Sequence, residues 1–138
     1  MADELTLEIQ NNLAAVQNAN ETASRWLEER TVSPDLQYFA NLAIEELATN
    51  CIKYGYDDAK EHMIEVKISI AADALVMTVS DDGHPFNPLE APAPDMSVDA
   101  EDRPIGGLGL HLLRQMSDRM EYVRERGKNR LTLSKAVK

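Results

Sequence analysis

The chain has 138 residues, the size of one domain, and 43% of them are hydrophobic, enough to form a core. Fourteen Lys and Arg against 24 Asp and Glu give a formal charge of −10, which disfavours nucleic acid and anionic membranes as partners. The single cysteine, Cys51, excludes an internal disulfide. No apolar run approaches membrane-spanning length, so the sequence favours a cytoplasmic protein with no membrane anchor.

The first half of the chain predicts one strand followed by two helices. Leu5, Leu7 and Ile9 alternate with polar residues, which is typical of a strand with one wet face. Apolar residues then recur at helical spacing from residue 13 to about residue 30. Ser33 and the proline after it form an N-cap and first turn, and a second helix is expected from there to Tyr54.

The second half predicts strands at about 64–70 and 75–80, a helix at about 107–117, and a hairpin that turns near Gly127. Alternating strands need cover on one face only. The expected fold is therefore α+β, a two-layer α/β sandwich with helices on one face of a mixed, mainly antiparallel sheet. We expect residues 1–138 to form a single domain.

The stretch from His84 to Pro104 has no period and contains five of the six prolines. An irregular segment of this length inside a compact domain is either a functional lid or disordered. Because it leads directly into a glycine cluster at the start of a helix, we interpret residues of about 84–105 as a lid.

The second helix carries a carboxylate and an amide one turn apart. At about 100° per residue, Glu46 and Asn50 lie at the margin of the apolar stripe, whereas Glu45 points towards solvent. Such a pair can hold a hydrated Mg²⁺ through the amide oxygen while the carboxylate orients or deprotonates a nucleophile. Taken alone, this spacing favours the alternative of an exposed polar helix face.

Asp81 follows a strand and continues its inward row, so its carboxylate needs a hydrogen-bond donor. The exocyclic amine of an adenine would serve, and Gly83 would let the backbone approach a ligand closely. The alternative is an Asp-Asp-Gly turn that closes a hairpin.

A third cluster, Gly106-Gly107-Leu108-Gly109-Leu110, opens a predicted helix. Bare N–H groups at a helix start form a cradle for phosphate, although glycine caps without a ligand are also common. The three clusters together, in this order and separated by the predicted lid, are more informative than any one of them.

The ordered set resembles the N, G1 and G2 boxes of the GHKL ATPase superfamily, and within it the stand-alone anti-sigma-factor serine kinases. The resemblance covers nearly the whole chain. The N box corresponds to residues 46–56, the G1 box to the segment that includes Asp81, Gly83, Pro85 and Phe86, and the G2 box to Gly106, Gly107, Leu108, Gly109 and Leu110.

The resemblance implies a role for each motif residue. Glu46 would be the catalytic base, Asn50 the Mg²⁺ ligand and Asp81 the acceptor of the adenine amine. The G2 glycines and neighbouring amides would hold the ATP phosphates, with Lys53 and Arg103 as further phosphate contacts.

Two positions depart from the family pattern. Pro85 stands where histidine-kinase relatives have a second glycine, and Asn129 takes the place of the usual threonine near adenine.

The resemblance favours a serine/threonine protein kinase that transfers the γ-phosphoryl of ATP to a small anti-anti-sigma-type protein. A sigma factor as a second partner and homodimerisation follow from the same resemblance.

Two alternatives share the fold: a nucleotide-responsive regulatory module with weak or no kinase activity, and a structural domain with an empty pocket. A histidine kinase is disfavoured because none of the histidines, His62, His84 and His111, lies on the first helix. Gyrase- and chaperone-type relatives need further domains, for which the chain has no room.

Overall fold

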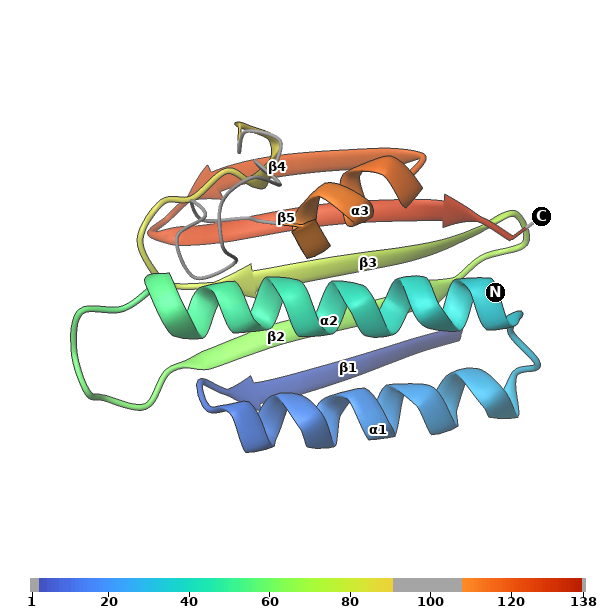
Figure 1. Ribbon diagram of the computed structural model, residues 1–138, viewed down its shortest axis with the longest axis horizontal. Coiled ribbons are helices and arrows are strands. Elements are labelled where there is room, and N and C mark those ends of the chain that lie inside the picture. The colour runs from blue at the N-terminus through green and yellow to red at the C-terminus, as the bar shows by residue number, and fades with distance from the viewer. Residues whose placement is uncertain (1–2, 91–107, 138) are drawn as a thin grey trace.

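The computed structural model describes residues 3–90 and 108–137. In it, a five-stranded sheet forms one layer and the helices form a second layer on one of its faces (Figure 1). The expected α+β sandwich is confirmed. The elements in chain order are β1 (Asp3–Gln10), α1 (Leu13–Glu29), α2 (Pro34–Tyr54), β2 (Met63–Ile70), β3 (Ala74–Asp81), η1 (Pro88–Glu90), α3 (Leu108–Met116), β4 (Arg119–Glu125) and β5 (Lys128–Ala136).

Local side-chain chemistry explains where the long helices begin and end. The Asn12 side chain accepts a hydrogen bond from the amide of Ala15 at 2.8 Å and caps α1. The Ser33 hydroxyl accepts from the Leu36 amide at 3.3 Å and caps α2, with proline in the first turn. Gly55 ends α2 by donating its amide to the Cys51 carbonyl.

The sheet order is β1-β2-β3-β5-β4, and each of the four pairings is antiparallel. The expectation of a mainly antiparallel sheet is thus confirmed, and no parallel pair occurs among the described strands. Arg126 and Gly127, with φ of 54° and 75°, form the two-residue turn between β4 and β5. Positive φ at both central positions matches the right-handed twist of the flanking strands.

The core lies between the helical layer and the inner face of the sheet. Alternation along β3 is complete, with Leu75, Met77, Val79 and Asp81 buried. Opposite them, α2 contributes the largest fully buried side chain, Phe39. Within the described residues, none of the helices combines the length and the apolar character that crossing a membrane would require.

The register between β3 and β5 matters most for the site. It sets Asp81 opposite Asn129 and Val79 opposite Leu131 at one end of the sheet. The C-terminal half of α2 lies over this end (Figure 1). Residues that are far apart in the sequence therefore meet where β3 ends, β5 begins and α2 finishes.

Candidate functional site

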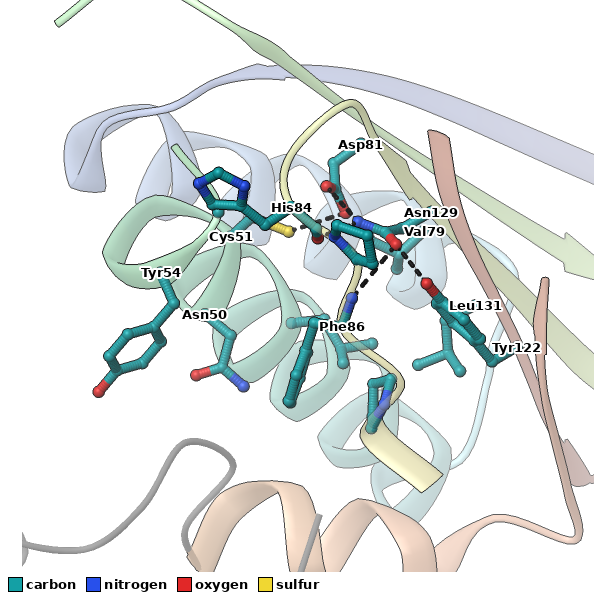
Figure 2. A pocket seen from close by; sticks show the side chains of 14 residues that line it. Asn50, Cys51, Tyr54, Val79, Asp81, His84, Phe86, Tyr122, Asn129 and Leu131 are labelled. Atoms are coloured by element: carbon teal, nitrogen blue, oxygen red, sulfur yellow. Dashed lines mark hydrogen bonds between the residues drawn. The ribbon is translucent and has the colours of Figure 1, made fainter. Parts of the chain in front are cut away.

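A pocket of about 220 Å³ opens at this end of the molecule (Figure 2). Its walls come from the last turns of α2, the ends of β3, β4 and β5, and the segment that follows β3. Most of the lining is apolar or aromatic, and its polar groups come from α2, the end of β3 and the start of β5. The lining residues are Leu47, Asn50, Cys51, Tyr54, Gly55, Val79, Asp81, His84, Pro85, Phe86, Pro88, Tyr122, Asn129 and Leu131.

Asp81 is buried, with 9% of its surface exposed, and its two carboxylate oxygens have unequal partners. Oδ1 accepts the Gly83 amide at 2.8 Å and the side-chain amide of Asn129 at 3.0 Å. Oδ2 accepts only the Cys51 thiol, at 3.2 Å, among the hydrogen bonds seen in the described residues. The sequence predicted that this inward carboxylate would need a donor, and the protein itself supplies several.

Cys51 belongs to the pocket rather than to the core alone. Its sulfur lies between α2 and Asp81, and the residue is half-buried. Burial, followed by the charge and hydrogen bond of Asp81, raises the pKa of the Cys51 thiol well above its ordinary value. The thiol therefore stays protonated and acts as a weak donor to the carboxylate.

Asn129 connects the pocket to the segment after β3. Its side-chain nitrogen donates to Asp81 and to the His84 carbonyl, at 2.8 Å for the latter. Its side-chain oxygen accepts the Phe86 amide at 3.4 Å and the hydroxyl of Tyr122. The dashed lines in Figure 2 follow this network across the pocket.

The turn after β3 is held from two sides. The His84 amide donates to the Gly55 carbonyl at 2.8 Å, and an Arg124 guanidinium nitrogen donates to the Gly83 carbonyl at 2.7 Å. A Cβ at position 83 would lie 2.7 Å from the Gly55 carbonyl oxygen. Only glycine lets this turn pack so closely against the end of α2.

Two histidines tie the loop after α2 to the same turn. His84 Nε2 lies 2.9 Å from Asp57, and His62 lies between Asp58 at 2.7 Å and Asp82 at 3.3 Å. The hydrogen bond to Asp58 is the largest cause that raises the pKa of His62, and the bond to Asp82 adds to it.

Glu46 and Asn50 occupy one side of α2, as predicted, with Glu45 exposed. Asn50 lines the pocket, whereas Glu46 lies one turn earlier and is half-buried outside the lining. Burial raises the pKa of the Glu46 carboxyl, the charge of Glu45 raises it further, and the charge of Lys53 opposes both. Lys53 itself is exposed on the last turn of α2.

The start of α3 lies against Glu46. A Cβ built on Gly109 would overlap the Oε1, Cδ and Cγ atoms of Glu46, so the glycine makes room for this carboxylate. The neighbouring leucines differ: Leu108 is exposed, while the side chain of Leu110 is buried in the core. With 1% of the whole residue exposed, Leu110 packs in the core and presents almost no surface to a ligand, contrary to its prediction as a phosphate contact.

A divalent cation would find a partial set of ligands here. The described residues contain no group of three His, Cys, Asp or Glu side chains placed to hold a metal ion. Mg²⁺ is commonly held by one or two protein oxygens together with the phosphates of a nucleotide. The Asn50 amide at the pocket wall, one turn from the Glu46 carboxylate, fits that donor set.

Comparison with known proteins identifies the family of the fold. The profile of the histidine kinase-like ATPase domain family matches residues 9–135. The chain belongs to this family. The match spans α2, the pocket and both strands of the C-terminal hairpin.

Several relatives of this ATPase domain are named kinases or anti-sigma factors. Serine/threonine-protein kinase BtrW of Bordetella bronchiseptica is 25% identical over 113 residues, which cover 79% of this chain and 80% of BtrW. Serine-protein kinase RsbW of Listeria monocytogenes is 32% identical over 90 residues, covering 62% of this chain and 57% of RsbW. Anti-sigma F factor of Clostridium perfringens is 26% identical over 86 residues, covering 62% of this chain and 61% of that protein.

A solved structure supports the fold of the ATPase domain. The crystal structure of the RsbU and RsbW domains of Rv1364c from Mycobacterium tuberculosis superimposes with a TM-score of 0.68 at 17% identity. The superposition covers 96% of this chain and 32% of that one.

The sequence-predicted residues of the ATPase domain fall into three groups. The pocket brings together Asn50, Asp81, Pro85, Phe86 and Asn129, and Gly83 is buried in the adjoining turn. Glu46 and Gly109 meet beside it, with Lys53, Leu108 and Leu110 placed as given above. Arg103, Gly106 and Gly107, with most of the predicted lid, lie outside the described residues.

Sequence analysis missed several pocket residues. Cys51 was not among the predicted site residues, although it directly follows Asn50 on α2 and lines the pocket with it. Tyr122 had a usable signal, because its register partner Leu131 is an inward residue of β5. His84 lies within the G1-box segment, between Gly83 and Pro85, and that position could have indicated it. Pro88 had no such signal, since it lies beyond the motif and no period governs the segment after β3.

Proposed function

We propose that the protein is an ATP-binding serine/threonine protein kinase that acts as an anti-sigma regulatory factor and phosphorylates a small anti-anti-sigma-type partner. The observation that carries this proposal is the pocket itself, where Asn50 of α2 and Asp81 of β3 share one apolar cavity. The printed names of the relatives, kinases and an anti-sigma factor, support the same activity.

The residues of the pocket suit an adenine base. Asp81 offers an acceptor in the wall of the cavity, and Val79, Leu131 and Phe86 supply apolar surface on which a flat ring can pack. Asp81 Oδ2, whose partner is a weak thiol donor, would accept the exocyclic amine. Asn50 and the start of α3 would then lie towards the phosphates.

Glu46 would accept the proton of the attacking serine hydroxyl. Its raised pKa makes it a better proton acceptor than an exposed carboxylate, provided that it is ionised at the working pH. Mg²⁺, when bound with the nucleotide at Asn50, would neutralise phosphate charge. Phosphoryl transfer depends mainly on positioning and electrostatics, and α2 holds Glu46 and Asn50 one turn apart on a rigid element.

The proposed partners follow from the relatives rather than from a described surface. An anti-anti-sigma-type protein would supply the serine, and a sigma factor and a second copy of the chain would be further partners. We also propose a cytoplasmic location, because the proposed sigma-factor partner acts there.

The test is transfer of labelled γ-phosphate from Mg-ATP to serine in a purified anti-anti-sigma protein from a relative's pathway. The decisive variant is Glu46→Gln, and the exposed neighbour Glu45→Gln is its matched control. A general base contributes roughly 10²- to 10⁴-fold, so Glu46→Gln should lose at least 100-fold in rate while Glu45→Gln keeps most of it.

Two results would count against the proposal. Equal rates in the Glu46→Gln and Glu45→Gln variants would remove Glu46 from the mechanism. Tight Mg-ATP binding with no phosphoserine on any anti-anti-sigma partner would favour a nucleotide-responsive binding module instead.

A further inference from the structure

The side-chain amide of Asn129 has only one orientation that satisfies its neighbours. The Phe86 amide can only donate, so the atom facing it must be the Asn129 oxygen. The His84 carbonyl and the Asp81 carboxylate can only accept, so the atom facing them must be the nitrogen. The Tyr122 hydroxyl donates to the same oxygen.

These contacts use the full hydrogen-bonding capacity of Asn129. Both N–H groups donate, one to Asp81 and one to His84, and the oxygen accepts two bonds. With 6% of its surface exposed, the side chain has no free donor or acceptor for a ligand. Asn129 therefore offers a bound nucleotide no hydrogen bond of its own, and among the neighbours that it holds Asp81 is the one with a carboxylate.

The same network makes the Asp81 carboxylate asymmetric. Within the described part of the chain, Oδ1 accepts from two N–H donors, Gly83 and Asn129, whereas Oδ2 accepts only from the Cys51 thiol. A thiol is a weak donor and gives way easily to an N–H group. A ligand in the pocket therefore finds one available carboxylate oxygen, not two.

The two common purines differ in the edge that they would present to such a carboxylate. Adenine offers one amino group beside a ring nitrogen that accepts. Guanine offers two neighbouring donors, a ring N–H and an amino group, which match a carboxylate with both oxygens free. If one oxygen is occupied, one buried guanine donor stays unpaired, which weakens binding by roughly 5- to 150-fold.

We propose that Asn129 determines the base preference of the pocket: by occupying Oδ1 of Asp81 it leaves Oδ2 as the single acceptor, which suits adenine and penalises guanine. Asn129 is thus a positioning residue. This inference rests on the proposed nucleotide binding and adds to it the expectation that guanine nucleotides bind less tightly than ATP.

The experiment measures dissociation constants for Mg-ATP, Mg-GTP and Mg-ITP by calorimetry. ITP lacks the amino group of GTP, so the GTP-to-ITP ratio reports whether Oδ1 can accept that group. The wild type should bind ATP most tightly and GTP no more than about threefold better than ITP, because Oδ1 is occupied. In Asn129→Leu, GTP should gain roughly tenfold over ITP, and the preference for ATP over GTP should fall at least tenfold.

Arg130→Leu is the matched control. Arg130 follows Asn129 on β5, but it is exposed, lies outside the pocket lining and pairs with Glu125 at 3.4 Å, so both ratios should stay within about threefold of the wild type. Thermal unfolding of each variant checks that it folds.

The outcomes separate the inference from the proposed function. A wild type that binds no Mg-ATP would overturn the proposed function. A wild type that binds Mg-ATP but prefers GTP over ITP tenfold would overturn the inference alone, even if Asn129→Leu does not fold. An Asn129→Leu protein that weakens ATP and GTP equally, with unchanged ratios, would also overturn it and leave a purely structural role for Asn129.

Discussion

Replacing Gly109 by alanine tests the contact between α3 and Glu46. The new Cβ would overlap three side-chain atoms of Glu46, and the far end of that flexible side chain is the part that can move. The carboxylate should therefore swing away from the start of α3. Because the overlap involves both Oε1 and Cδ, no small adjustment relieves it.

The effects on stability and on activity should then separate. Alanine is favoured over glycine inside a helix by about 0.5–1 kcal/mol, which offsets the cost of moving Glu46, so the free energy of unfolding should change by less than about 1 kcal/mol. The phosphorylation rate should fall by roughly 10²-fold or more, as expected when a general base is displaced.

Gly127→Ala is the matched control, because it should behave in the opposite way. Gly127 has a φ of 75° in the turn between β4 and β5, and no atom of the described residues lies within 4 Å of its added Cβ. Left-handed backbone costs a residue with a Cβ about 1–2 kcal/mol, so this variant should lose stability and keep its rate.

The assay combines initial rates of phosphoserine formation with urea unfolding of both variants. A Gly109→Ala protein that keeps its rate within about threefold of the wild type would refute the placement of Glu46 as the base. A further check is the double variant with Glu46→Gln, in which the alanine should cause no additional loss of rate.

Two other predictions concern titratable groups near the pocket. The raised pKa of His62 means that its contacts with Asp58 and Asp82 stabilise the fold fully below the ordinary histidine pKa of about 6.5, and that this stability is lost as the pH rises through the raised value. Urea unfolding measures the difference in unfolding free energy between the wild type and His62→Gln. This difference should shrink between pH 6 and pH 9, roughly the range over which a histidine with a raised pKa titrates. A difference that stays constant with pH would contradict the prediction. The pKa of the Cys51 thiol, which lies against Asp81, is raised, so little reactive thiolate forms at pH 8. A disulfide reagent at pH 8 should therefore label the folded protein at least roughly tenfold more slowly than the urea-unfolded chain. Equal labelling rates would argue against this prediction.

Much of the fold could be predicted because its signals are local. Leu5, Leu7 and Ile9 alternate as a strand must, and Ser33 with the following proline begins α2 at the predicted residue. The inward position of Asp81 followed from its parity with Val79. Each of these predictions needs only neighbouring residues and the period of one element.

The partners of Asp81 could not be predicted in the same way. Cys51 lies 30 residues before it and Asn129 lies 48 residues after it, and neither distance is visible in a local pattern. The pairing depends on the register between β3 and β5, which is set by the packing of the whole sheet. For this reason the sequence indicated a carboxylate in need of a donor but not that Asn129 would supply one.

The order of the strands also has a consequence for biosynthesis. β5 comes last among the described strands, yet it pairs with β3 in the interior of the sheet and brings Asn129 to Asp81. A nascent chain that has not yet released β5 from the ribosome therefore lacks one wall of the cavity, and β3 has an unpaired edge that can aggregate. Affinity for nucleotide should consequently arise only once β5 has been made and released, in one step with closure of the sheet.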